Sequence, residues 1–294
     1  IIFGTIKVLP LVIISYGVGL GIEFVFAAIN KHPIQEGFLV SGMLIPLIVP
    51  VDIPWAMLAV AVAFAVVLGK EVFGGTGMNV LNIAMVTRAF LFFAYPTKMS
   101  GDKVWTNTSL EEGQTLVDGY SGATALGNAV EGGVDAIPSI IESIIGTIPG
   151  SVGETSIIAI GLGALLLLLT GIGSWRIMLS TFLGGFIMAA VFNLVAGDNL
   201  FMQLTPLNQL VIGGFAFGAV FMATDPVTGT QTNSGQWSYG ILIGILAILI
   251  RVANPAYPEG MMLAVLIGNV CAPLIDHVVI QSNIKKRLNR LKTA

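Results

Sequence analysis

The sequence predicts an all-α polytopic membrane protein. Of its 294 residues, 55% are hydrophobic and 10% are charged, with a mean hydropathy of +0.91, whereas about 25% of the residues of a soluble domain are charged. The apolar runs are continuous and do not alternate, which argues against a membrane β-barrel. The 36 glycines favour closely packed or broken helices, because glycine lets helix backbones approach within a membrane.

Seven apolar runs are long enough to cross a bilayer, at about 20 residues per span: residues 8–29, 55–72, 80–96, 156–173, 175–197, 236–252 and 260–279. Two further runs, 38–50 and 207–223, are shorter or rich in glycine. They end at a Pro-Val-Asp-Ile-Pro segment and at Asp225-Pro226, respectively. The sequence therefore predicts broken helices at these two places, and about nine spans in all.

The two halves of the chain resemble each other. A glycine-bearing run is followed by Asp52 or Asp225, and then by a tryptophan and a base, Lys70 or Arg251. Chance similarity between apolar segments is the alternative to a true repeat. If the repeat holds, run 8–29 pairs with 175–197, and one more span is expected upstream of Ile1. We expect a first membrane repeat at 1–96, a polar loop at 97–155, a second repeat at 156–280 and a basic tail at 281–294.

Charge predicts the orientation. Five of the thirteen basic residues follow Gln281, whereas eight of the sixteen acidic residues lie within 97–155. Basic segments next to membrane spans favour the cytoplasm, so the C-terminus is expected inside. Counting spans backward then places loop 97–155 outside and gives the halves opposite orientations. Inverted repeats with broken helices are typical of ion-transporting membrane proteins.

The loop carries the most distinctive motif. Residues 118–124 read Asp-Gly-Tyr-Ser-Gly-Ala-Thr, a small-residue turn with an accessible hydroxyl. This motif resembles a signal for attaching FMN to threonine. Together with residues 70–77, 92–96, 221–226 and 254–260, it resembles the family of B subunits of the bacterial sodium-translocating NADH:quinone oxidoreductase, over nearly the whole chain.

The resemblance implies that Thr124 carries FMN through a phosphoester, with Asp118, Ser121 and Gly122 as recognition and turn residues. A tethered flavin suits a carrier that must stay in place, since the protein supplies position and electrostatics. Downstream, the stretch from Ser139 to Thr147 is expected to form a helix with one isoleucine-rich face, on the membrane surface or against a partner.

The resemblance also implies a non-covalent riboflavin. Asn79 and Asn82 are three residues apart, which would place them on one helical face at the mouth of a span, and their amides could bond a flavin ring. A helix cap or an interhelical hydrogen bond is the alternative. The chain departs from the family pattern here, since Asn82 is followed by Ile-Ala where Pro-Ala is expected.

Two carboxylates interrupt predicted spans. Glu23 and Asp276 are candidates for a Na⁺ path, because acids inside a membrane are rare and oxygen ligands suit Na⁺. Alternatively, Glu23 pairs with a base and Asp276 sits at the cytoplasmic interface. Gly19 and Gly21 belong to a stripe beside Glu23, which suggests close helix packing, while the family resemblance suggests a neighbouring quinone. Lys70, Arg88 and Arg251 are candidate counter-ions or phosphate contacts.

The remaining residues limit the chemistry of this chain. The single cysteine, Cys271, excludes an intrachain disulfide and an all-cysteine metal site, so Na⁺ is the only metal expected. No dinucleotide-binding glycine motif follows a strand, so NADH would be oxidised on another subunit.

Three functions are consistent with these patterns. We expect a subunit of a Na⁺-pumping NADH:quinone oxidoreductase in the bacterial inner membrane. It would work with a second FMN-carrying subunit and an NADH-oxidising flavoprotein, with no nucleic acid. One alternative is the D subunit of the related ferredoxin:NAD oxidoreductase of the Rnf type, which shares the Ser-Gly-Ala-Thr motif. The other is a non-redox channel or transporter built on the same inverted repeat.

Overall fold

The computed structural model describes most of the membrane-spanning part of the chain. The residues described are 5–31, 36–99, 105–107, 120–122, 126, 139–146, 148, 150–196, 199–254 and 260–293. They are predominantly helical, and five of the described helices are long and apolar enough to cross a membrane. The predicted all-α membrane class is therefore confirmed.

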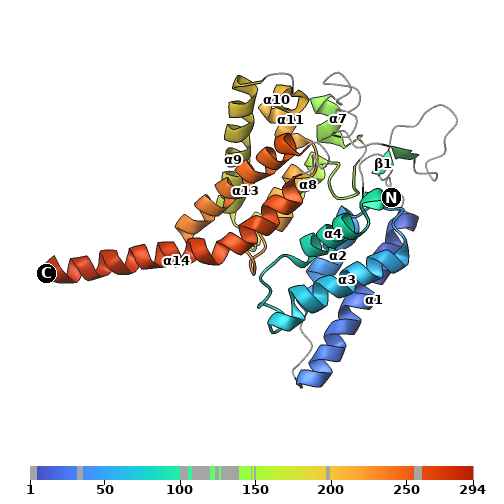
Figure 1. Ribbon diagram of the computed structural model, residues 1–294, viewed down its shortest axis with the longest axis horizontal. Coiled ribbons are helices and arrows are strands. Elements are labelled where there is room, and N and C mark those ends of the chain that lie inside the picture. Colours follow the sequence, from blue (N-terminus) through green and yellow to red (C-terminus); the bar gives the residue numbers. More distant parts are fainter. Residues whose placement is uncertain are drawn as a thin grey trace.

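The first half forms one group of helices, at the lower right of Figure 1. Its elements are α1 (Thr5–Asn30), α2 (Phe38–Ile48), α3 (Trp55–Gly69), the short 3₁₀ turn η1 (Glu71–Phe73), α4 (Ile83–Ala94) and α5 (Pro96–Met99). Helix α1 packs against α2 and α3, and α4 packs against α2 and α3.

The second half forms another group. Its elements are α8 (Ile157–Leu169), α9 (Trp175–Leu194), α10 (Leu200–Gln203), α11 (Pro206–Val211), α12 (Phe215–Phe217), η3 (Gly218–Met222), α13 (Asn233–Ala253) and α14 (Met261–Thr293). Helix α13 packs between α9 and α14. Helix α13 lies so close to α9 at Gly244 that a Cβ atom at this position would be 2.2 Å from the carbonyl oxygen of Thr181.

Both predicted broken helices are present. Helix α2 ends at Ile48, two residues before Pro50, and α3 begins only at Trp55. In the second half, Gly213 and Gly214 have φ values of 73° and 69°, a left-handed conformation that glycine adopts without strain. The run 207–223 is therefore split into α11, α12 and the π-helical turn η3.

The packing of the two halves recurs. Helix α1 contacts α2 and α3, and α4 contacts both; correspondingly, α9 contacts α11, η3 and α13, and α14 contacts α13 and η3. Figure 1 shows α1 running downward from the N-terminal end, whereas α9 runs upward to α10. This antiparallel placement agrees with an inverted repeat. Lys70 follows the last residue of α3 and Arg251 lies in the last turn of α13, and both are buried.

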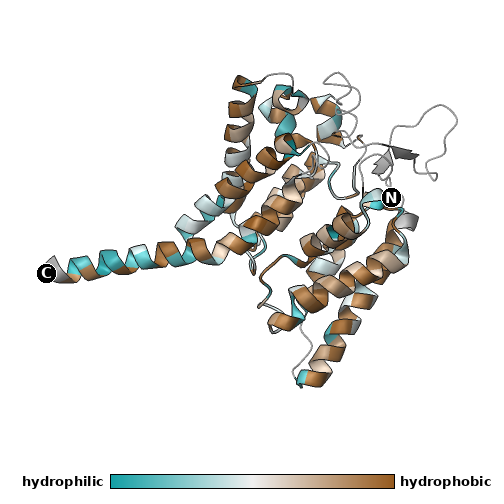
Figure 2. Ribbon diagram, in the orientation of Figure 1, coloured by the Kyte–Doolittle hydropathy of each residue, from teal (hydrophilic) through white to brown (hydrophobic). Residues whose placement is uncertain are grey.

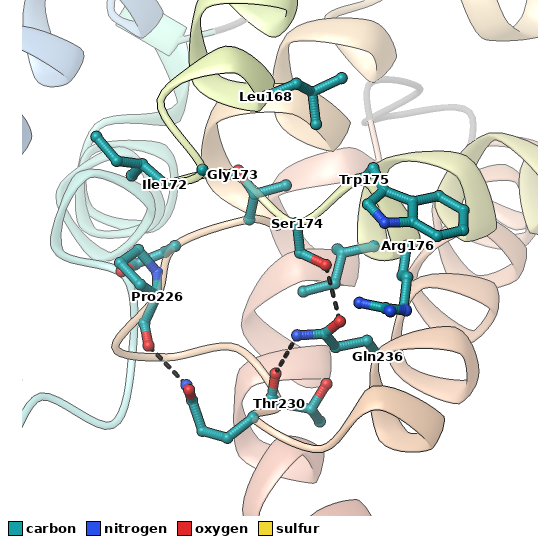
Figure 3. A pocket seen from close by; sticks show the side chains of 14 residues that line it. Leu168, Ile172, Gly173, Ser174, Trp175, Arg176, Pro226, Thr230 and Gln236 are labelled. Atoms are coloured by element: carbon teal, nitrogen blue, oxygen red, sulfur yellow. Dashed lines mark hydrogen bonds between the residues drawn. The ribbon is translucent and has the colours of Figure 1, made fainter.

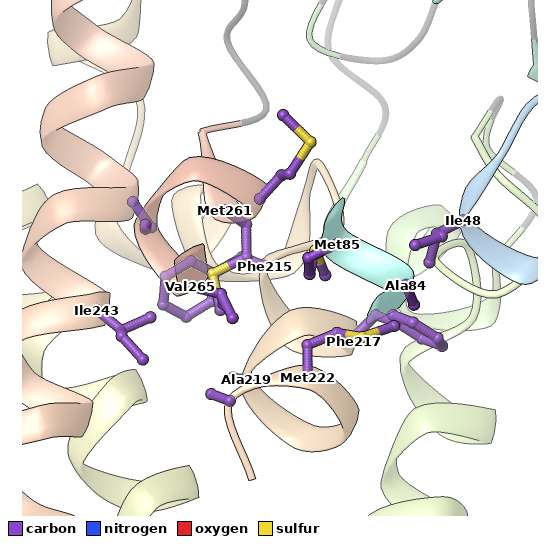
Figure 4. Close-up of a cluster of buried hydrophobic side chains, with 14 of the residues drawn as sticks. Ile48, Ala84, Met85, Phe215, Phe217, Ala219, Met222, Ile243, Met261 and Val265 are labelled. Atoms are coloured by element: carbon purple, nitrogen blue, oxygen red, sulfur yellow. The ribbon is translucent and has the colours of Figure 1, made fainter. Parts of the chain in front are cut away.

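The two halves share one apolar core. Figure 4 shows Ile48, Ala84 and Met85 from the first half close to Phe217 and Met222 from the second. All of these side chains are at most 3% exposed. Burial of apolar side chains at this seam holds α2 and α4 against α12 and η3.

The described parts of the loop contain short elements. Strands β1 (Trp105–Asn107) and β2 (Tyr120–Gly122) pair antiparallel, with Thr106 opposite Ser121. These strands were not predicted from the sequence. Helix α7 (Ile140–Ile145) was expected, and it begins with a capping box formed by Ser139 and Glu142. Its four isoleucines are exposed, as the predicted apolar face requires.

Candidate functional site

A cavity of about 300 Å³ lies at the seam between the halves. It is lined by α2, by the segment between α3 and α4, by the end of α8 and by the segment after η3. Its walls are mostly apolar, with a few converging polar side chains: Ser41, Lys70, Thr76, Asn79, Asn82, Thr224 and Asp225. Mostly apolar walls with a few placed polar groups are typical of small-molecule sites.

Asn79 and Asn82 both line this cavity, but they do not lie on a helix as predicted. Helix α4 begins at Ile83, and Asn82 is its N-cap, accepting a hydrogen bond from the Met85 N–H at 3.2 Å. Asn82 has an extended backbone (φ −65°, ψ 121°), so α4 cannot continue back through it to Asn79. The cap expected as the alternative interpretation of Asn82 is therefore present, and both amides reach the same cavity.

Asp225 is a site residue that was not predicted from the sequence. The Asn82 side-chain amide donates to its Oδ2 at 3.1 Å, across 143 residues of sequence. Asp225 also accepts hydrogen bonds from the Thr228 hydroxyl and the Val227 N–H, each at 3.0 Å. A carboxylate thus joins the polar break of the second repeat to the start of α4. The sequence feature that could have identified Asp225 as a site residue is its position in that polar break.

A second cavity, of about 450 Å³, adjoins the first. The two share the lining residues Ile172, Gly173, Thr224, Asp225 and Pro226. Figure 3 shows that the second cavity is more polar, with Ser174 donating to Gln236 at 2.8 Å and Arg176 beside Trp175. Asp225 therefore stands between an apolar chamber and a polar one.

Glu23 and Lys70 form a buried ion pair. Their residues are 5% and 3% exposed, and the Lys70 ammonium contacts Oε1 of Glu23. Oε2 of Glu23 has no hydrogen-bond partner among the described residues. Lys70 also lines the 300 Å³ cavity, so the pair links the carboxylate on α1 with that chamber. The interpretation in which Glu23 pairs with a base fits this geometry.

Gly19 and Gly21 of α1 differ in their surroundings. A Cβ added to Gly19 would lie 2.0 Å from the Phe38 ring, so Gly19 serves the close packing of α1 on α2. No described atom outside the helix backbone lies within 4 Å of a Cβ added to Gly21. Close packing therefore accounts for Gly19 and not for Gly21.

Asp276 receives three hydrogen bonds at the start of α13. Its carboxylate accepts from the backbone N–H groups of Gln231 and Thr232, at 2.8 and 3.0 Å, and from the Thr232 hydroxyl at 2.6 Å. The negative charge lies at a helix N-terminus, where the macrodipole favours it. Asp276 thus fixes α14 to the start of α13.

The two buried arginines lie near the other end of the bundle. Arg88 pairs with Glu154 at 2.5 Å. Arg251 donates to both oxygens of Gln209, at 2.5 and 2.8 Å, and to the carbonyl of Ile212 at 3.0 Å.

Leu126 is buried against Gly213, close to Arg251. Leu126 follows the predicted flavin motif by two residues, whereas Thr124 and Asp118 lie outside the described residues, and Ser121 and Gly122 belong to β2.

The comparisons with known proteins agree with this architecture. The model of the NQR2, RnfD, RnfE family matches residues 1–285. This chain belongs to that family. The chain is 51% identical, over 292 residues, to the B subunit of the Na⁺-translocating NADH-quinone reductase of Azotobacter vinelandii, and the match covers 98% of this chain and 70% of that protein. It is 49% identical to the protein of the same name from Stutzerimonas stutzeri, with the same coverage, and 47% identical to that from Chromohalobacter salexigens, of which it covers 69%.

The family model and the individual relatives carry different information. The description of the family includes both NQR2 and Rnf members, so membership alone does not choose between them. All three of these relatives are named as B subunits of the Na⁺-translocating NADH-quinone reductase.

Proposed function

We propose that this chain is the membrane-embedded B-type component of a Na⁺-translocating NADH:quinone oxidoreductase in the bacterial inner membrane. The observation that carries the proposal is identity of about half to such subunits over 98% of the chain. NADH is oxidised on a separate flavoprotein subunit, and electrons pass through flavins in the membrane to a quinone. The exergonic transfer drives Na⁺ outward.

Covalent FMN on Thr124 belongs to this proposal. The support is the motif at 118–124, with Asp118, Ser121 and Gly122 as the recognition and turn residues. The described residue nearest to Thr124 on its C-terminal side, Leu126, is buried against Gly213. A tethered flavin at this point would carry electrons outside the lipid, on the extracytoplasmic side.

Riboflavin in the 300 Å³ cavity is the second cofactor in the proposal. The cavity fits a flavin in chemistry, since its apolar walls suit a flat ring system and the amides of Asn79 and Asn82 could bond the polar edge. Its volume falls at the lower end of the range for small-molecule sites, and the adjoining polar chamber extends it. When bound there, a flavin would supply an electron carrier between the two repeats. Asn79, Asn82 and Asp225 would orient it, and the surrounding apolar side chains would exclude water.

The Na⁺ path and the quinone complete the proposal. Glu23 and Asp276 are the proposed carboxylates of the Na⁺ path, and Gly19 and Gly21 border the proposed quinone region. Support for Glu23 comes from its buried Oε2, which has no partner among the described residues. Lys70 balances the charge of this carboxylate in an apolar setting, where a lone charge would be costly.

The proposed function is tested by measuring which electron donor and acceptor the purified complex uses. The purified complex should reduce quinone with NADH, and added Na⁺ should stimulate the rate several-fold. Reduced ferredoxin with NAD is the pair for the Rnf-type alternative. Ferredoxin-dependent NAD reduction without quinone reductase activity would replace our proposal with that alternative, and the absence of any redox activity from an intact complex would favour a channel.

The riboflavin site is tested by Asn82→Ser. Serine is also a good N-cap, so α4 should keep its start while the cavity loses the Asn82 amide. We expect roughly a tenfold fall in retained non-covalent flavin, since a lost hydrogen bond in a buried site costs ~1–3 kcal/mol. Flavin released by acid from the purified complex would be quantified by chromatography.

The control for this variant is the covalently bound flavin, which should remain unchanged. A wild-type riboflavin content in both Asn82→Ser and Asn79→Leu would remove these amides from the flavin site.

A further inference from the structure

The last turns of α14 form a basic, amphipathic helix that projects from the bundle. Every residue from Ile280 to Leu291 is exposed. Residues 281–293 contain five bases, Lys285, Lys286, Arg287, Arg290 and Lys292, and no acid. We call the part of α14 from Ile280 to Thr293 the tail helix.

One face of the tail helix is apolar. Ile280, Ile284, Leu288 and Leu291 follow one another at intervals of four, four and three residues, which places them along a single stripe of an α-helix. They are 44% to 75% exposed. Most of the bases lie away from this stripe. An apolar stripe opposite a basic face is the pattern of helices that lie in a membrane interface.

The direction of α14 agrees with such a position. Pro273 lies inside the helix, and proline kinks a helix by removing a backbone hydrogen bond. Figure 1 shows α14 changing direction along its length, so that the tail runs sideways from the bundle and not parallel to α9. In Figure 2 this projecting part is largely hydrophilic, in contrast to the brown helices of the bundle.

The stripe begins close to the end of the spanning segment. Asp276 bonds the start of α13, where both helices reach the polar break of the second repeat. Ile280 is four residues beyond Asp276, about one helical turn. A span of about 20 residues that begins at Met261 ends near Ile280, so the apolar stripe would start at the membrane boundary, where its side chains can enter the lipid while the bases meet the headgroups.

We propose that the tail helix lies along the cytoplasmic surface of the membrane and binds anionic lipid headgroups. Charge identifies the binding partner of the tail helix as anionic lipid, because the cytoplasmic leaflet is negative and attracts basic segments next to a span. Geometry supports the same partner, since a helix that turns sideways at the membrane boundary meets lipid along its whole length. This inference rests on a cytoplasmic C-terminus and is independent of any flavin.

The test measures the depth of spin labels. In the complex with Cys271→Ser, a label would be attached at Leu288→Cys on the stripe and, as a matched control, at Ser282→Cys on the opposite face. Each protein would be placed in nanodiscs with or without phosphatidylglycerol. Collision with dissolved oxygen reports lipid exposure, and collision with a water-soluble nickel chelate reports water exposure.

We expect the Leu288 label to favour oxygen and the Ser282 label to favour nickel when phosphatidylglycerol is present. The difference should shrink at least several-fold without this lipid, and also when all five bases are replaced by glutamine (Lys285→Gln, Lys286→Gln, Arg287→Gln, Arg290→Gln and Lys292→Gln). Equal nickel access at both labels would place the tail helix in water and overturn the proposal. A Leu288 label shielded from both reagents, whatever the lipid, would instead indicate a protein partner and would also overturn it.

Discussion

Thr124→Ala is expected to abolish covalent flavin completely, while the protein still inserts in the membrane. The substitution removes the hydroxyl, to whose oxygen the FMN phosphate would be bonded, together with one methyl group. It lies in the polar loop at 97–155, outside the predicted spans, so apolar burial in the bundle should be unchanged. Fluorescence of the denatured protein in a gel measures the bound flavin, and immunoblotting of membranes measures insertion.

Thr124→Ser serves as the control for this substitution, because it keeps the hydroxyl. We expect partial attachment in that variant. Undiminished flavin on the denatured Thr124→Ala protein would show that the attachment site lies elsewhere.

Breaking the buried pair of Glu23 and Lys70 should destabilise the protein strongly. Glu23→Gln leaves the Lys70 charge buried without its partner, and Lys70→Met leaves the Glu23 carboxylate in the same position. Removing one member of a buried ion pair costs about 3–5 kcal/mol, whereas replacing both is often close to neutral. We therefore expect each single variant to unfold at a clearly lower temperature, and the double variant Glu23→Leu with Lys70→Met, which replaces both charges by apolar side chains, to unfold close to the wild type.

The double variant also separates stability from ion transport. If Glu23 belongs to the Na⁺ path, the stable double variant should need a several-fold higher Na⁺ concentration for half-maximal quinone reduction. Its covalent FMN content should not change. A Na⁺ dependence identical to that of the wild type would leave the pair with a purely structural role.

The sequence predicted the helices well where length and composition decide the outcome. Runs of about 20 apolar residues have few alternatives in a membrane, since every backbone polar group needs an internal partner. The breaks after α2 and at Gly213-Gly214 followed from proline and glycine. The short strands β1 and β2 carried no comparable signal, because three-residue strands lie below the length at which alternation can be recognised.

The site was less predictable because it depends on contacts between distant segments. Asn82 and Asp225 are 143 residues apart in the sequence and are joined by a hydrogen bond. Local spacing and periodicity cannot predict a contact between residues so far apart. The prediction of a helix through Asn79 was wrong because Asn82 has an extended backbone and caps the start of α4. Glu23 and Lys70 were separately recognisable as unusual charges in apolar runs, but their pairing follows from the packing of α1 on α3.

Flavin bound to the wild-type chain through denaturation is the most direct test of the central claim, that this protein is a redox carrier. The protein would be produced in a host that has the flavin-attaching enzyme, denatured, and examined both by fluorescence in a gel and by intact mass. We predict a fluorescent band and a mass increase equal to one FMN less one water, located on the peptide that contains Thr124. A dark band with the unmodified mass would contradict the assignment of a covalent flavin to this chain.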